Sequence, residues 1–493
     1  MRALIALAAL AAAAVAHAAP IGYDGARHLL DRTGFGATDR EVREYAALDR
    51  VEAVDRLLAG TRREAVTPPP AFATASFEPF ARVKDMSPED RKTYQRKLVQ
   101  EGLELRAWWI GEMLATPSPL TERMTLFWHN HFATSQRKVR LGQLMYRQNV
   151  LLRREALGNF GTLLHGIARD PAMLVWLDHA GSRRQAPTEN FAREVMELFT
   201  LGVGNYTERD VKEAARAFTG MSLERQTGEY RYRPFIHDDG VKTVLGKVGN
   251  FDGDDVLNIL LARPETARFV ADKVWREFVS PTPDPAEVER WAAAFRGSHY
   301  EVKPLMRAAL TSDAFWDPTN RGTLVKSPVD VVVGTLRTFD IHPTDLRPAA
   351  VQVAVLGQNL FAPPNVKGWP GGEAWIDTAT LLGRKQFVER VFRGSEGMSA
   401  MAQPEQMLAR AGSPIGAGQG PGTNVAMQRM MDRGLGSYAF NPQRWTHSLA
   451  EGETARDVEH LVLALSPVNP VPVDADAVER VRALVADPAY QLR

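Results

Sequence analysis

The chain has 493 residues, of which 44% are hydrophobic and 24% are charged, an ordinary composition for a folded globular protein. Its 60 basic and 59 acidic residues are mixed along the sequence, so the composition provides no strongly basic face for nucleic acid or anionic lipid. Cysteine is absent, which excludes disulfides, thiolate catalysis and lipid attachment through a cysteine. Because the charges are balanced and mixed, we expect no nucleic-acid partner.

Residues 1–18 predict a secretory signal peptide. Met1 and Arg2 give a short basic start, Ala3 to Val15 is an apolar run, and Ala16-His17-Ala18 places small residues at a cleavage point. No later stretch approaches the length of apolar sequence that a bilayer requires. We expect a periplasmic or secreted protein with no integral membrane segment.

Helix signals dominate the following sequence. Ser87-Pro88-Glu89-Asp90 combines a capping residue, a proline at the first helical position and a carboxylate, and it predicts a helix to about Leu114. Ser118-Pro119 predicts the start of the next helix.

That next helix ends in the run LFWHNHF, Leu126 to Phe132, which contains His129 and His131. Residues two apart on a helix point about 200° away from one another, so the pair can share a metal only if the backbone is extended there. Both histidines are candidate metal ligands or catalysts, and the alternative is that each is a hydrogen-bonded core residue.

The segment TENFAREVMELFTLGVG, Thr188 to Gly204, places four polar residues on one arc of a helix, about 100° wide. They are Asn190, Arg193, Glu194 and Glu197. Two carboxylates, a guanidinium and an amide can bind a metal, position a water molecule or hold a polar ligand. The alternative is an ordinary solvent-facing side of an amphipathic helix.

Further along the chain, Thr207 to Asp210 predicts another helix start, and Glu229 to Phe235 predicts a strand or hairpin arm. The turn that follows contains His237 and Asp238, which are candidate metal ligands. The spacing of an EF-hand is not met.

The loop from Asn359 to Asp377 carries Lys367, Trp369 and Trp375 among glycines and prolines. Aromatic rings beside glycines can form a platform for sugars or peptides, so we expect Lys367 and Trp369 to contact such a ligand. The alternative is a loop that its tryptophans fix to the core.

The predicted fold class is mainly α: a multi-helix globular domain with a few short strands or hairpins, followed by a flexible segment and C-terminal helices. The predicted boundaries are a main helical domain at 19–395, a flexible Gly/Met-rich linker at 396–440, and C-terminal helices at 441–493 that dock on the main domain.

Several of these stretches, in this order, resemble an exported bacterial family known as domain of unknown function 1800. The matching segments extend from about residue 25 to 395 and are HLLDRTGFGAT (His28 to Thr38), FWHNHFATS (Phe127 to Ser135), the glutamate segment Glu189 to Gly220, FIHDDGVKTVLG (Phe235 to Gly246), ARFVADKVWREFVS (Ala267 to Ser280) and the GWPGG loop. Phe199 stands where many members carry a histidine. The resemblance implies an exported partner that looks like the sulfatase and phosphatase fold.

Two functional hypotheses follow. The first is a hydrolase-like or metal-dependent enzyme, with a divalent metal as the candidate cofactor and a cleft lined by His, Glu, Asp and Arg side chains. Its catalytic residues would be His129, His131, Arg193, Glu194 and Glu197, its ligand-binding residues Asn190, Lys367 and Trp369, and its metal ligands His129, His131, Glu194, Glu197, His237 and Asp238. The second is a non-catalytic binding or assembly protein that contacts a glycan, a peptide or the sulfatase/phosphatase-like partner.

Overall fold

The computed structural model describes residues 19–77, 83–393, 438, 440–449, 455–472 and 474–493. In this part of the chain the fold is mainly α-helical, which confirms the predicted fold class, and the strands form two short antiparallel hairpins. Most of the predicted linker at 396–440, and the predicted signal peptide at 1–18, lie outside the described residues. The division into domains stays a prediction.

The N-terminal third is helical throughout. Its elements are α1 (Gly22–Thr33), α2 (Asp39–Ala46), α3 (Arg50–Ala59), α4 (Ala71–Thr74), α6 (Pro88–Ala115), α7 (Pro119–His131), α8 (Gln136–Val139), α9 (Gly142–Arg154), α10 (Phe160–Ala168) and α11 (Pro171–Trp176).

The middle third contains the hairpins. Its elements are η1 (His179–Gly181), α12 (Glu189–Glu194), η2 (Val195–Thr200), α13 (Glu208–Ala217), β1 (Met221–Leu223), β2 (Tyr230–Tyr232), η3 (Pro234–Ile236), β3 (Lys242–Val244), β4 (Lys247–Gly249), α14 (Gly253–Ala262), α15 (Pro264–Phe278), α16 (Pro285–Gly297) and α17 (Val302–Thr311).

The remaining described elements are again helical. They are α18 (Asp313–Trp316), η4 (Pro318–Asn320), α19 (Pro328–Thr338), α20 (Arg347–Val355), η5 (Gly372–Trp375), α21 (Thr378–Arg393), α24 (Pro442–Ser448), α25 (Ala455–Val462), α26 (Ala477–Ala486) and η8 (Pro488–Gln491).

Local sequence explains where the helices begin. Ser87 accepts a hydrogen bond from the Asp90 backbone N–H at the start of α6, and Thr207 forms a capping box with Asp210 at the start of α13. The strand predicted within Glu229 to Phe235 is β2, which pairs with β1. The second hairpin turns through Leu245 and Gly246 at positive φ, the geometry of a tight two-residue hairpin turn.

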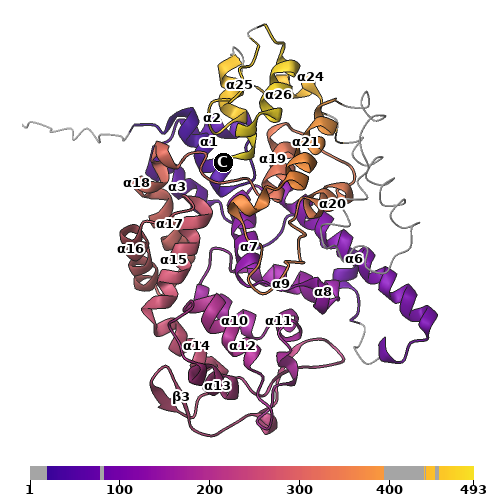
Figure 1. The fold of residues 1–493 in the computed structure, drawn as a ribbon, viewed down its shortest axis with the longest axis vertical. Coiled ribbons are helices and arrows are strands. Elements are labelled where there is room, and N and C mark those ends of the chain that lie inside the picture. Colours follow the sequence, from indigo (N-terminus) through magenta and orange to yellow (C-terminus); the bar gives the residue numbers. More distant parts are fainter. Residues whose placement is uncertain (1–18, 78–82, 394–437, 439, 450–454, 473) are drawn as a thin grey trace, which may run out of the picture.

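The helix α7 lies at the centre of the molecule, with α15 and α17 on one side of it and α19 and α20 on the other (Figure 1). The described residues bury two apolar clusters, and α7 supplies side chains to both. Met124 and Trp128 belong to the cluster shared with α10 and α15 to α17, whereas Leu126 belongs to the cluster shared with α6, α19 and α20. A helix between two cores is buried on nearly all sides, so its polar residues must find buried partners.

The long helix α6 projects from the body at its N-terminal end (Figure 1), where residues 87–93 are exposed. The helices α25 and α26 contact α1 and α21 and share a buried cluster with α19 and α20. None of the helices in the described ranges is both long and apolar enough to span a membrane.

Candidate functional site

The helix that carries the predicted polar arc changes form at its middle. α12 is an α-helix that ends at Glu194, and η2 continues it as a π-helix. At its end the Leu201 N–H donates to the Met196 carbonyl, five residues earlier, at 2.8 Å. π-turns within helices are rare and occur frequently at functional sites. The wider turn begins directly after Glu194 and contains Glu197.

His131 and Lys273 together bind the C-terminal carbonyls of η2. His131 Nε2 lies 3.0 Å from the Phe199 carbonyl oxygen, and Lys273 Nζ lies 3.2 Å from that of Leu198. The lysine also lies 3.1 Å from His131 Nδ1. Because a carbonyl can only accept, Nε2 carries the imidazole proton and Nδ1 accepts from the ammonium.

This arrangement gives His131 a structural role. Burial and the charge of Lys273 hold the pKa of His131 well below its usual value, so the ring is neutral. Both ring nitrogens are occupied, which leaves none for a metal or for proton transfer. Burial also lowers the pKa of Lys273 to about 8.

His129 points into the other core. Its ring centroid lies 5.5 Å from those of Trp109, Phe361 and Trp369. Burial lowers the pKa of His129 to about 3, and its Nε2 has no hydrogen-bond partner among the described residues. The two histidines thus face separate cores, as residues two apart on a helix must. They do not form a pair.

The GWPGG loop is attached to the C-terminal end of α7. The Trp369 backbone N–H donates to Asn130 Oδ1 at 2.7 Å. Gly368 has φ of +81°, and a Cβ there would lie 2.1 Å from the same oxygen, so only glycine fits. Trp369 is buried against His129 and is therefore a fixing point for the loop, not the exposed ligand platform that the sequence suggested.

This attachment brings Lys367 towards the polar arc. The Lys367 side chain is exposed, and its charge acts on the half-buried carboxyl of Glu194. Burial raises the pKa of Glu194, the charge of Glu197 raises it further, and Lys367 and Arg193 oppose the rise. Glu197, also half-buried, accepts a hydrogen bond from the Tyr206 hydroxyl at 2.5 Å.

Three segments far apart in the sequence therefore meet at one place: the end of α7, the junction of α12 with η2, and the GWPGG loop. A family model described as "Protein of unknown function (DUF1800)" matches residues 28–492. The chain belongs to this family. The match confirms the resemblance seen in the sequence and extends it to the C-terminal helices. Comparisons with curated proteins and with solved structures found no match for the chain.

Arg193 and Asn190 of the polar arc differ in how far their side chains are available to a ligand. Arg193 donates to both carboxylate oxygens of Glu208, at 2.6 and 2.8 Å, and also pairs with Glu189. Its donors are therefore largely occupied by the start of α13. Asn190 is exposed on the same side of the helix and can reach a ligand from solvent.

His237 and Asp238 are fixed to the end of α13. His237 Nδ1 lies 2.9 Å from the Thr219 carbonyl oxygen. Asp238 forms a two-point ion pair with Arg216 at 2.8 and 3.1 Å, and this bond is the main reason why the pKa of Asp238 is lowered. The turn that contains His237 and Asp238 is therefore bound to Thr219 and Arg216.

The six predicted metal ligands are consequently not assembled in one place. Within the described ranges, no group of three or more His, Asp or Glu side chains has the geometry to hold a metal ion. The physical reason is that the histidines face opposite cores and the His237 turn is bound to another helix. Only Glu194 and Glu197 of that set lie together.

Two residues in this region were not among the sequence-based candidates. Lys273 lies on α15 beside buried residues, but its contact with His131 joins two helices 142 positions apart and could not be inferred from spacing. Tyr206 stands only nine residues after Glu197, but its bond depends on the loop after η2 and could not be inferred from spacing.

Proposed function

We propose that this protein is an exported acid–base hydrolase whose reacting carboxyls are Glu194 and Glu197. One observation carries the proposal: two half-buried carboxyls lie three residues apart across the start of a π-helix, and their environments differ. One has a raised pKa, and the other is hydrogen-bonded by a tyrosine. Carboxyl pairs with different environments are the usual basis for separate acid and base roles.

The two roles follow from these environments. Glu194, with the raised pKa, is the proton donor to the leaving group of the substrate. Glu197 is the base that accepts a proton from the attacking water as the water oxygen bonds to the substrate, and Tyr206 holds its carboxylate in place. Each turnover consumes one water molecule. One proton then passes from Glu197 back to Glu194, which returns both carboxyls to their starting states.

Lys367 and Asn190 are the ligand-binding groups of this proposal. Both side chains are exposed beside the carboxyl pair, so an anionic or polar part of the substrate can reach them from solvent. The signal peptide expected at 1–18 would place this chemistry in the periplasm or outside the cell. No metal is assigned, because the roles above require only the two carboxyls.

An activity screen tests this proposal. The mature protein would be assayed on chromogenic esters, glycosides, sulfate and phosphate esters, and peptides. Glu194→Gln and Glu197→Gln should each lower turnover about 100-fold or more, the usual size of general acid or base catalysis. Glu229→Gln, at an exposed carboxyl on the first hairpin, is the matched control and should leave turnover unchanged. Turnover that survives both changes would refute the assignment.

A second candidate function is binding or assembly with the sulfatase/phosphatase-like partner. It is favoured by the exposure of Asn190, Asn365 and Lys367, which are available for contact with another protein. In that case the carboxyl variants would abolish capture of the partner in a pull-down, and the screen would detect no turnover by the wild-type protein.

A further inference from the structure

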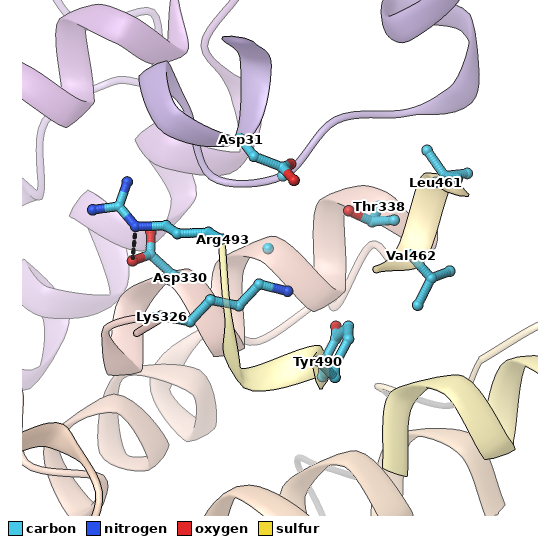
Figure 2. Close-up of a pocket in the computed structure, with 10 residues that line it drawn as sticks. Asp31, Lys326, Asp330, Thr338, Leu461, Val462, Tyr490 and Arg493 are labelled. Atoms are coloured by element: carbon cyan, nitrogen blue, oxygen red, sulfur yellow. Dashed lines mark ion pairs between the residues drawn. The ribbon is translucent and has the colours of Figure 1, made fainter. Parts of the chain in front are cut away.

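A small cavity lies between α1, α19 and the C-terminal elements (Figure 2), and neither Glu194 nor Glu197 is among its lining residues. Its volume is about 20 Å³, which is enough for one water molecule or one monatomic ion. Polar lining comes from Asp31, Lys326, Asp330, Thr338 and Arg493, and apolar lining from Leu461 and Val462 of α25 among others.

Lys326 extends into this cavity (Figure 2). Its ammonium lies 4.0 Å above the ring of Tyr490, and it forms no hydrogen bond or ion pair with any residue that the structure describes. Burial lowers its pKa to about 8, so at neutral pH the group is still mainly a cation. Lys326 is partly buried, and an ammonium removed from most of its water without an acceptor is unfavourable unless something else fills that role.

The carboxylates around the cavity are already occupied. Asp31 accepts from Arg27 at 2.6 Å, Asp330 is bound by Arg123, and Glu277 accepts from Arg493 at 2.9 Å. Arg493 Nε lies 3.5 Å from Asp330 Oδ2, as the dashed line in Figure 2 marks, yet its N–H has no hydrogen-bond acceptor. Each carboxylate is thus matched by a guanidinium.

Lys326, Arg32 and Arg384 are cations of this region that form no ion pair with a carboxylate of the described residues. Arg32 and Arg384 are fully buried and donate only to neutral oxygens, including the Val279 carbonyl at 2.9 Å and the Lys326 carbonyl at 2.9 Å. Both leave Nε without an acceptor. Buried charge of one sign in excess is normally compensated by a counter-ion or by loss of protons.

The geometry points to a site for one monatomic anion, of the halide class, held in this cavity by Lys326, Arg493 and the Thr338 hydroxyl. Asp31 and Asp330 also line the cavity and would repel an anion, but their guanidinium partners offset that repulsion. The ion would join both ends of α19, through Lys326 and Thr338, to Arg493 at the end of the described C-terminal elements, and would so stabilise the attachment of the C-terminal helices. This role is separate from the proposed hydrolysis.

Thermal unfolding of the full-length mature protein tests the site. Chloride would replace gluconate at constant ionic strength, and the wild-type midpoint should rise with the logarithm of the chloride concentration, by about 2 °C for each tenfold excess over the dissociation constant. Lys326→Met should abolish the dependence on chloride. Lys385→Met, at an exposed lysine beside Arg384, is the matched control and should respond as wild type. Equal midpoints in chloride and gluconate for the wild type would overturn the proposal.

Bromide provides a second test that does not depend on a variant. Crystals of the wild-type protein soaked in bromide should show an anomalous peak beside Lys326 Nζ. A water molecule alone at that position, with no anomalous signal, would refute the anion site even if Lys326→Met failed to fold.

Discussion

At the scale of single residues, Glu194 is the group whose environment departs most usefully from that of an ordinary surface carboxylate. It is half-buried, Glu197 lies beside it, and Lys367 reaches it from a loop that follows it by more than 170 positions in the sequence. A solvent-facing side of an amphipathic helix would leave the carboxyl with its normal pKa. The raised pKa means that keeping Glu194 ionised at neutral pH destabilises the folded state.

This predicts an unusual effect of Glu194→Gln on stability. Because the folded pKa is raised above 4.5, the favourable contribution is present below that pH and is lost as the pH rises through the folded pKa. The variant should therefore be more stable than wild type at pH 7, by about 0.5 kcal/mol for a half-buried group. The difference should vanish near pH 4, where the wild-type carboxyl is protonated. Denaturant titrations at both pH values measure this, and a variant less stable at pH 7 would contradict it.

At the scale of elements, η2 depends on side chains from two other helices. His131 of α7 and Lys273 of α15 bond to its last carbonyls and to each other. The π-helix that contains Glu197 is therefore held in place from both neighbouring helices. Removing either side chain leaves buried polar groups without partners.

A double-mutant cycle should detect this coupling. Lys273→Met and His131→Phe should each lower the free energy of unfolding by about 1–3 kcal/mol, and the double variant should lose clearly less than the sum. Lys303→Met, at an exposed lysine of α17, is the control and should change stability by less than about 0.5 kcal/mol. Strictly additive losses would show that the His131–Lys273 contact contributes nothing.

The loop that carries Lys367 makes a second prediction at this scale. Gly368 and Gly371 both have positive φ, but a Cβ at Gly368 would collide with Asn130, whereas a Cβ at Gly371 would meet open space. Gly371→Ala should cost about 1 kcal/mol from backbone strain alone, and Gly368→Ala at least about 3 kcal/mol. Thermal unfolding of the two variants compares them. Equal losses would mean that the loop is not anchored by this contact.

How far the sequence predicts this structure depends on the range of the interactions. The starts of α6 and α13 follow from caps within four residues, and the β2 arm follows from local alternation. The polar arc was also predictable from helical periodicity. The π-helix and the ring partners of His131 were not, because they depend on contacts as distant as the 142 positions between His131 and Lys273.

At the scale of the whole molecule, buried histidines set the response to acid. The described residues include four with strongly lowered pKa values: His28, His131, His129 at about 3 and His179 at about 4. All four remain neutral in the folded state at pH values where the unfolded chain would be protonated. Asp170 acts in the opposite sense, because burial raises its pKa to about 7.

Stability should therefore fall as the pH drops from about 6.5 to about 4. A histidine whose pKa is lowered by folding stabilises the folded state at pH values above the pKa of the unfolded chain. That stabilisation is lost as the pH falls, because protons then bind to the unfolded chain. The four histidines outnumber the one aspartate, so unfolding takes up protons in this range and the free energy of unfolding falls with the pH. Calorimetric unfolding in buffers of different ionisation enthalpy measures the uptake. An unchanged midpoint across this range would contradict the neutral state of the buried rings.

The central claim is that Glu194 and Glu197 form one interacting carboxyl pair, and NMR titration of protein with ¹³C-labelled glutamate tests it most directly. Single substitutions assign the two resonances. We predict that the Glu194 carboxyl titrates above 4.5 and that Glu197→Gln lowers its pKa, because the neighbouring charge is removed. If Glu194 titrates at an ordinary value and is indifferent to Glu197→Gln, the two carboxyls are independent surface groups and the acid–base assignment is wrong.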